Sequence, residues 1–379
     1  MRSVLVLLAA CAAPATAPAV EPVEPAKPTA ILGYVTASPP DEDGFTRALA
    51  AHDEATLERL LSIDLPAFES RARGNVPAAT LARLDAAWAD AIARGAPMLM
   101  FDGTRGDQEI LTASVMRVGV WVDDRFVPIG PPVKDAVGGW YDAAHGRAIT
   151  VGLQVNDCKS DFCPRISLVR VEAWSPTAKL LGKLEVKTEE AHAVVVESGA
   201  QLRVQLVDCT VQGCRTPWQS LDGKPGDDEA DRLAVDHRGT QLTLPHAGTT
   251  VRDATLVAND RSYALDKRHR VTELHCVAAD PANAIVASTF DRCECDDGAA
   301  HVLMHQIDRV ELATGALVEV AHGKGQAAIA SGKSGVFVQR GNDRVERFAS
   351  LADVGTSGAA LPKGFLLLPP AGGRMCCGL

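Results

Sequence analysis

Aromatic residues, clusters of basic residues and long apolar runs are all scarce in this chain of 379 residues. Phe, Trp and Tyr make up 4% of it, which disfavours a platform on which nucleic-acid bases or sugars stack. The formal net charge is −10, and this argues against nucleic acid, whose binding needs Lys and Arg to replace condensed counterions. After the N-terminus no stretch approaches the roughly 18 consecutive apolar residues of a membrane-spanning helix.

Several catalytic signatures are missing as well. The chain has no Gly-x-Ser-x-Gly, no His-Glu-x-x-His and no Cys-x-x-Cys. Gly332-Lys333-Ser334 is similar to the end of a phosphate-binding loop, but Ala327 stands where that loop needs its first glycine. We therefore expect no cofactor and favour binding or scaffolding over catalysis. An exported, hydrolase-like enzyme is the alternative, because a site assembled from distant residues leaves no local motif.

The N-terminus carries the most specific pattern in the chain. Leu8-Ala9-Ala10-Cys11 follows Arg2 and an apolar stretch that starts at Val4. This resembles the lipobox of bacterial lipoprotein precursors, in which small residues precede a cysteine that is lipidated. The resemblance covers residues 1–12 and implies that residues 1–10 are a signal peptide and that Cys11 becomes the lipidated first residue. Lipid chains hold a protein to a membrane because each buried CH₂ contributes roughly 0.8 kcal/mol.

The residue after the lipidated cysteine helps to sort such lipoproteins in Gram-negative bacteria. Here it is Ala12 and not the Asp that retains them in the inner membrane, so the resemblance implies an outer-membrane lipoprotein. Its partners would then be the membrane, through the lipid alone, and envelope proteins or polymers. An ordinary secretory signal, cut at Ala13-Pro14-Ala15, is the alternative and would release a secreted, soluble binding protein.

Residues 11–30 form the second predicted unit, a tether. The stretch from Ala12 to Thr29 contains Pro14, Pro18, Pro22, Pro25 and Pro28. Proline at this density favours an extended polyproline II chain of about 3.1 Å per residue, so the stretch spans ~55 Å.

Residues 31–97 are predicted to be a small helical region. Asp53 is a candidate N-cap for a helix with Leu57, Leu60 and Leu61. A second helix should begin after Pro77, and Gly95 is placed to end it. Its apolar residues recur at helical spacing and are expected in the core: Leu81, Leu84, Trp88 and Ile92.

Residues 98–379 change to the two-residue periodicity of strands, and the chain as a whole is predicted to be mainly β. Residues 114–129 read as a hairpin around Asp123-Asp124-Arg125, and residues 140–151 as another. Leu153–Cys163 is similar to Val204–Cys214 at an offset of 51, and Thr255–Leu265 is an echo without cysteines.

A shorter motif also recurs in this region. Asp308-Arg309-Val310-Glu311 returns as Asp343-Arg344-Val345-Glu346, and Arg170-Val171-Glu172 is similar. The turn at Ala313-Thr314-Gly315 is like the outer hairpin of a propeller blade. Strand repeats of 35 to 51 residues suggest stacked sheets. We therefore expect an irregular or small β-propeller-like domain, with a pair of β-sandwiches as the alternative.

Ten cysteines fit an oxidising envelope compartment. Cys158 with Cys163, and Cys209 with Cys214, flank polar turns at the spacing of a hairpin, so each couple is predicted to form a disulfide. The remaining disulfide candidates are Cys276, Cys293, Cys295, Cys376 and Cys377. A zinc site made from both hairpin couples is the alternative for the first four.

One further constellation could hold a metal. Cys293 and Cys295, with His301 and His305 beyond them, supply two thiolates and two imidazoles, which suits a tetrahedral soft-metal site. The simpler interpretation is that these cysteines pair with others, Cys276 being the nearest, while the histidines lie on a wet strand face.

Overall fold

The computed structural model describes most of the chain beyond the tether. The described residues are 30–34, 41–102, 115–133, 136–142, 147–155, 167–176, 179–188, 193–198, 202–207, 209–210, 213–214, 219–221, 250–252, 255–265, 274–294, 300–325, 327–341, 344–368 and 375–378. Residues 1–29, which hold the predicted signal peptide and the predicted tether up to Thr29, therefore lie outside them, as do Cys158, Cys163 and Cys295.

Three helices open the fold: α1 (Glu42–Ala50), α2 (Glu54–Ala72) and α3 (Ala78–Arg94). Asp53 caps α2 by accepting a hydrogen bond from the Thr56 amide at 3.1 Å. Gly95 follows the last residue of α3, so the predicted start of the first helix and both predicted ends of the second are confirmed. None of the described helices is long and apolar enough to cross a membrane.

Helix α2 is kinked in the middle. Asp64 leaves helical geometry, with φ −150° and ψ 72°, two residues before Pro66. Its carboxylate then accepts a hydrogen bond from the Ala67 amide at 3.1 Å, so it caps the second half of the helix. The kink follows from the proline, which removes a backbone donor and crowds the preceding turn.

The rest of the described chain is β-structure. The strands are β1 (Ala96–Asp102), β2 (Val115–Val122), β3 (Arg125–Pro128), β4 (Ala136–Asp142), β5 (Arg147–Val155), β6 (Ser167–Trp174), β7 (Leu180–Thr188), β8 (Ala193–Ser198), β9 (Leu202–Val207), β10 (Cys209–Thr210), β11 (Gly213–Cys214), β12 (Gln219–Ser220), β13 (Thr250–Arg252), β14 (Thr255–Ala258), β15 (Arg261–Ala264), β16 (Leu274–Ala279), β17 (Asn283–Glu294), β18 (Ala300–Glu311), β19 (Leu317–Lys324), β20 (Ala327–Gly332), β21 (Gly335–Arg340), β22 (Arg344–Phe348), β23 (Ala359–Ala360), β24 (Phe365–Leu367) and β25 (Met375–Gly378). A 3₁₀ turn, Leu351–Asp353, follows β22.

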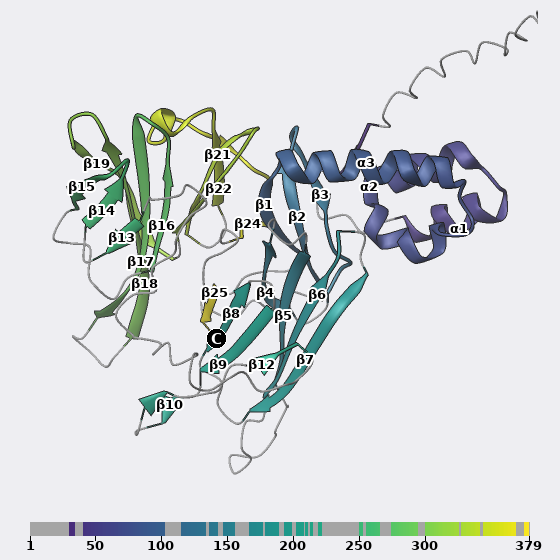
Figure 1. Ribbon diagram of the computed structural model, residues 1–379, viewed down its shortest axis with the longest axis horizontal. Helices are drawn as coiled ribbons and strands as arrows, with labels where there is room; N and C mark the ends of the chain where they lie inside the picture. The colour runs from purple at the N-terminus through teal and green to yellow at the C-terminus, as the bar shows by residue number, and fades with distance from the viewer. Residues whose placement is uncertain are drawn as a thin grey trace, which may run out of the picture.

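These strands form small antiparallel sheets, each named here by its first strand in the chain. The β4 sheet (β4 to β7), the β13 sheet (β13 to β15), the β16 sheet (β16 to β19) and the β20 sheet (β20 to β23) follow the chain order. The β1 sheet has the order β24-β1-β2-β3, and the β8 sheet has β12-β9-β8-β25. The C-terminal segment thus returns to add a strand to two sheets formed much earlier in the chain (Figure 1).

Neighbouring sheets pack face to face. One face of the β20 sheet, with Ile329 and Val338, joins a core shared with the β13 and β16 sheets. Its other face, with Phe337, packs on Met98 and Phe365 of the β1 sheet. Both faces of the β20 sheet are therefore buried, which does not fit a two-layer sandwich, where each sheet keeps one outer face.

The helices share their core with the β1 and β4 sheets. Trp88 of α3 and Leu61 of α2 belong to the same buried cluster as Val118 and Ile149. The Trp88 Nε1 also donates to the carbonyl oxygen of Pro128 at 2.9 Å, which fixes α3 on the end of β3. The helical region thus stabilises the β-structure by direct burial, and it packs at one side of the molecule (Figure 1).

The sequence repeats fall on equivalent strands. Leu153–Val155 ends β5, Val204–Val207 ends β9, and Thr255–Ala258 is β14, each the second strand of its sheet in chain order. The second motif lies instead on the third strands: Asp308–Glu311 on β18, Arg344–Glu346 on β22 and Arg170–Glu172 on β6, while Asp343 lies outside the described residues. The predicted turn at Ala313-Thr314-Gly315 joins β18 to β19. The mainly β fold with an N-terminal helical region is therefore confirmed.

His305 is a buried titratable group on β18, with 5% of its surface exposed. Burial lowers its pKa below the usual 6.5, hydrogen bonds to the backbone of Gly325 and Lys324 offset part of this, and the nearby charge of Arg340 adds to the lowering. The folded protein thus keeps His305 neutral at a pH where the unfolded chain binds a proton.

We predict that this difference makes the protein less stable in mild acid. Above pH 6.5 the His305 ring is neutral in both the folded and the unfolded protein, so it contributes no pH dependence. As the pH falls below 6.5, the unfolded chain binds a proton at His305 first, and this favours unfolding. Urea unfolding at pH 7.5 and 5.5 should show a smaller loss of stability on acidification for His305→Gln than for the parent. His52→Gln, at an exposed position after α1, should behave like the parent. An equal loss in parent and His305→Gln would contradict the prediction.

Candidate functional site

The chain enters the fold through residues 31–34, which lie between α2 and β3. The amide of Leu32 donates to the Ser62 carbonyl at 2.8 Å, and Tyr34 exchanges two backbone hydrogen bonds with Phe126, of 3.1 and 2.8 Å. Gly33 has φ +53°, and a Cβ there would lie 2.7 Å from the Phe126 carbonyl oxygen. Only glycine suits this close, left-handed passage, so the segment is held by backbone geometry.

A buried ion pair lies beneath this segment. Arg117 of β2 is 2% exposed and Asp64 of α2 is 0% exposed. The guanidinium donates to both Asp64 oxygens, to the Tyr34 hydroxyl at 2.8 Å and to the Gly130 carbonyl at 3.0 Å and 3.3 Å. All five guanidinium N–H groups therefore have acceptors. Burial raises the pKa of Tyr34, so its hydroxyl stays protonated.

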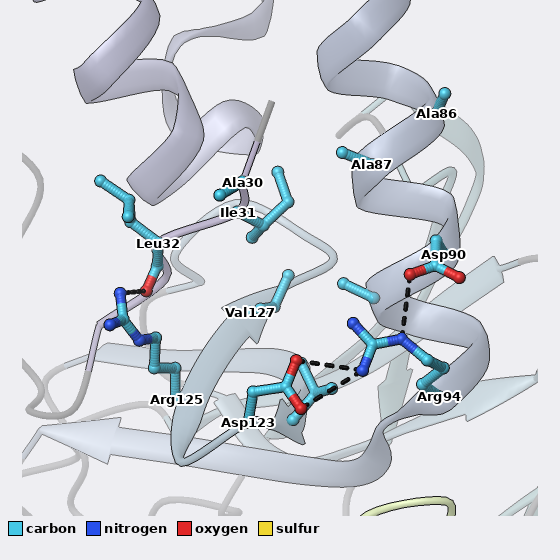
Figure 2. A pocket seen from close by; sticks show the side chains of 12 residues that line it. Ala30, Ile31, Leu32, Ala86, Ala87, Asp90, Arg94, Asp123, Arg125 and Val127 are labelled. Atoms are coloured by element: carbon cyan, nitrogen blue, oxygen red, sulfur yellow. Dashed lines mark hydrogen bonds and ion pairs between the residues drawn. The ribbon is translucent and has the colours of Figure 1, made fainter. Parts of the chain in front are cut away.

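Beside the entering segment lies a groove of about 700 Å³. One wall is the segment Ala30–Leu32, the opposite wall is α3, and the end of the β2–β3 hairpin closes the third side (Figure 2). Its apolar lining comes from small side chains: Ile31, Ala86, Ala87, Ala91, Val122 and Val127. The alanines of α3 present little bulk, so the groove owes its width to them.

Charged groups form the rim of the groove. Arg94 donates to Asp90 at 2.9 Å and to Asp123 at 3.0 Å, and these hydrogen bonds raise its pKa. Arg125 donates to the Leu32 carbonyl at 2.7 Å from the other side (Figure 2). Asp123 and Asp124 both have positive φ, 49° and 60°, as the predicted tight hairpin requires.

The chemistry of these side chains suits binding. The two lining carboxylates, Asp90 and Asp123, are both paired with Arg94, and the other lining side chains besides Arg125 are apolar. Both carboxylates accept hydrogen bonds from the Arg94 guanidinium, so part of their hydrogen-bonding capacity is used within the protein. An apolar floor with a charged rim fits an extended ligand with small apolar side chains.

The predicted disulfide couples are described only in part. Cys209 and Cys214 are direct partners in the register of β10 and β11, which is the backbone arrangement that a hairpin disulfide needs. Their side chains, and both Cys158 and Cys163, lie outside the described residues. The two disulfides therefore stay predictions.

The strand register also bears on the other candidate disulfides. Cys276 pairs with Ala287, and Cys293 lies six residues farther along β17, about 20 Å away at the rise of a strand. A disulfide spans Cα atoms less than about 7 Å apart, so pairing of Cys276 with Cys293 is not compatible with this sheet. Cys376 and Cys377 lie in β25 opposite Val195 and Val194. Successive strand residues point to opposite faces, so these two lie on different faces.

The structure brings the four candidate metal ligands together only in part. Cys293 is the register partner of His301, but His305 lies four residues along β18, about 14 Å away. The backbone of Gly325 and Lys324 binds the His305 ring. Among the side chains that are described, no three His, Cys, Asp or Glu residues gather as metal ligands.

Sequence reasoning missed both the groove and the Asp64–Arg117 pair. The pair did leave a signal, a single Arg in the apolar run Val115–Val122 and a single Asp in the apolar stretch Leu60–Phe68. Charged residues in such runs are buried only when paired. The groove left none, because its walls come from three distant segments.

Comparison with known proteins assigns the chain to no family. No family model matches the chain, and no curated protein matches its sequence. Among solved structures, a variant of the Synechocystis apocarotenoid oxygenase aligns at 8% identity over 74% of this chain and 76% of its own, with a TM-score of 0.27. A GDP-Man-dependent mannosyltransferase from Leishmania mexicana aligns at 10% identity over 74% and 86%, with a TM-score of 0.26. Scores this low support no argument about function.

We predict that Asp64→Ala unfolds the protein much more easily than loss of a surface pair. It leaves the Arg117 charge buried and unpaired, which costs about 3–5 kcal/mol. Arg170→Ala breaks an exposed pair with Glu185 and should cost less than about 1 kcal/mol. The double change Asp64→Leu with Arg117→Met should recover most of the loss. Denaturant unfolding measures all three, and a small effect of Asp64→Ala would contradict the assignment.

The hairpin disulfides can be tested on the intact protein. Peptide mapping without reduction should recover Cys209 linked to Cys214, and Cys158 linked to Cys163. Each short loop should stabilise the fold by about 2 kcal/mol. Free thiols at all four positions, or links between the two couples, would overturn the pairing. A link between Cys276 and Cys293 would contradict the register of β16 and β17.

Proposed function

We propose that the protein is a lipoprotein of the bacterial cell envelope, anchored through Cys11, whose β-rich domain binds an envelope protein or polymer. The observation that carries the proposal is the way in which the chain enters the fold. Residues 31–34 are hydrogen-bonded to α2 and to β3 at once, and through Tyr34 to Arg117. A tether that begins at Cys11 would therefore be joined to the rigid core and not to a loose end.

We further propose that the sheets form an irregular β-propeller-like domain. Three observations support this architecture over a pair of sandwiches. The β13, β16 and β20 sheets share one core, the β20 sheet is buried on both faces, and β24 returns to the β1 sheet. The equivalent positions of the sequence repeats point in the same direction.

Binding is favoured over catalysis because of the groove. Its carboxylates are held in ion pairs and its floor is apolar, which suits a ligand more than a reaction. The groove also opens beside Ala30–Leu32, where the tether meets the domain. A ligand bound there would be held close to the point of attachment.

The anchor is tested by Cys11→Ser. In bacteria that process lipoproteins, the parent should stay with the membrane fraction after washing with high salt, because lipid binding does not depend on surface charge. Cys11→Ser should leave the membrane or accumulate as precursor, and Cys376→Ser is the matched control that should stay bound. If the variant remains as firmly bound as the parent, or the mature N-terminus is Thr16, the anchor is wrong and the secreted alternative gains support.

A further inference from the structure

We propose that residues 20–28 of the tether dock into the groove of the same chain. The groove is built partly from Ala30, Ile31 and Leu32, which continue directly from this segment. One reversal of the chain between Pro28 and Ala30 would bring the segment over α3. The tether is therefore the ligand that the groove always has within reach.

The segment has a strict three-residue pattern, which gives it one apolar face to place against the groove. Residues 20–28 are Val-Glu-Pro, Val-Glu-Pro, Ala-Lys-Pro. Polyproline II has three residues per turn, so this pattern places three faces along the helix. One face carries Val20, Val23 and Ala26, the second carries charges, and the third carries prolines. A regular apolar stripe of this kind is not needed in a plain spacer.

The apolar side chains of the two surfaces are both small. Small apolar side chains on the stripe would meet the alanine face of α3, Ala87 and Ala91, where there is no bulk to displace. Glu21 and Glu24 lie beside the stripe, and the rim of the groove carries the exposed Arg125 as well as Arg94 in its pairs with Asp90 and Asp123. The docked charges would then stay at the rim, in contact with water.

Docking within one chain has a low entropic cost. Linkage to Ala30 gives the segment an effective concentration in the millimolar range, so weak contacts suffice. Prolines stiffen the segment before it binds, which reduces the conformational freedom that is lost. The contact would be reversible, because the groove is open and its lining is small.

Docking would control how far the domain can extend from its point of attachment. The full tether spans ~55 Å, and the part of it that docks no longer contributes to that span. Where Cys11 is the anchor, as proposed above, docking would hold the domain near the membrane and release would let it extend. A ligand that takes the groove would then also lengthen the tether.

Photo-crosslinking of the full-length protein tests the docking. With p-benzoylphenylalanine in place of Val23, irradiation should give adducts within the chain, mapped by mass spectrometry to residues 86–94 or 122–127. The same group in place of Ala15, outside the triplets, should give at least fivefold less of these adducts. Ala87→Asp blocks the groove and should reduce them at least fivefold.

Ala93→Asp is the matched control, because Ala93 is exposed on α3 and does not line the groove. It should leave the yield unchanged. Adducts spread over the surface, equal yields from positions 15 and 23, or no effect of Ala87→Asp would overturn the proposal. Adducts from position 23 to other proteins in place of the groove would overturn it too, and would assign the stripe to a partner. None of these outcomes depends on lipidation.

Discussion

Arg117 carries a permanent charge in a place that water does not reach, and its acceptors come from three separate parts of the chain. Asp64 belongs to the kinked helix α2, Tyr34 to the entering segment, and Gly130 to the stretch after β3. The charge is tolerable only if all of them are in place at once, because an unpaired buried ion costs several kcal/mol. The relative position of helices, entering segment and β1 sheet therefore depends on this one guanidinium.

The groove is a product of that arrangement. Its walls are the entering segment, α3 and the β2–β3 hairpin, and each is fixed by a contact with the others. The Tyr34–Phe126 pairing fixes the first, the Trp88 hydrogen bond to Pro128 fixes the second, and the Arg94–Asp123 pair joins the second to the third. The chain therefore enters the fold at a defined place and next to a defined surface.

Local patterns predicted the elements well where one short stretch decides the outcome. Asp53 and Gly95 marked helix boundaries because a cap depends on the few residues beside it. The predicted turn Asp123-Asp124-Arg125 marked a hairpin, and the turn itself is the two residues with positive φ, Asp123 and Asp124, because Arg125 begins β3. Pairing of Cys276 with Cys293 failed for the opposite reason. Nearness in sequence says little about two cysteines when one long strand carries the second about 20 Å from the first.

By itself, the sequence determined that the protein is mainly β after a short helical region, that its strands recur in related units, and where the chain turns. These are set by periodicity and by residues with special backbone preferences, both of which act over a few positions. Only the tertiary structure decided that Asp64 meets Arg117, that both faces of the β20 sheet are buried, and that three distant segments enclose a groove. Such contacts join residues far apart in the chain, and their energies arise only once the sheets have packed.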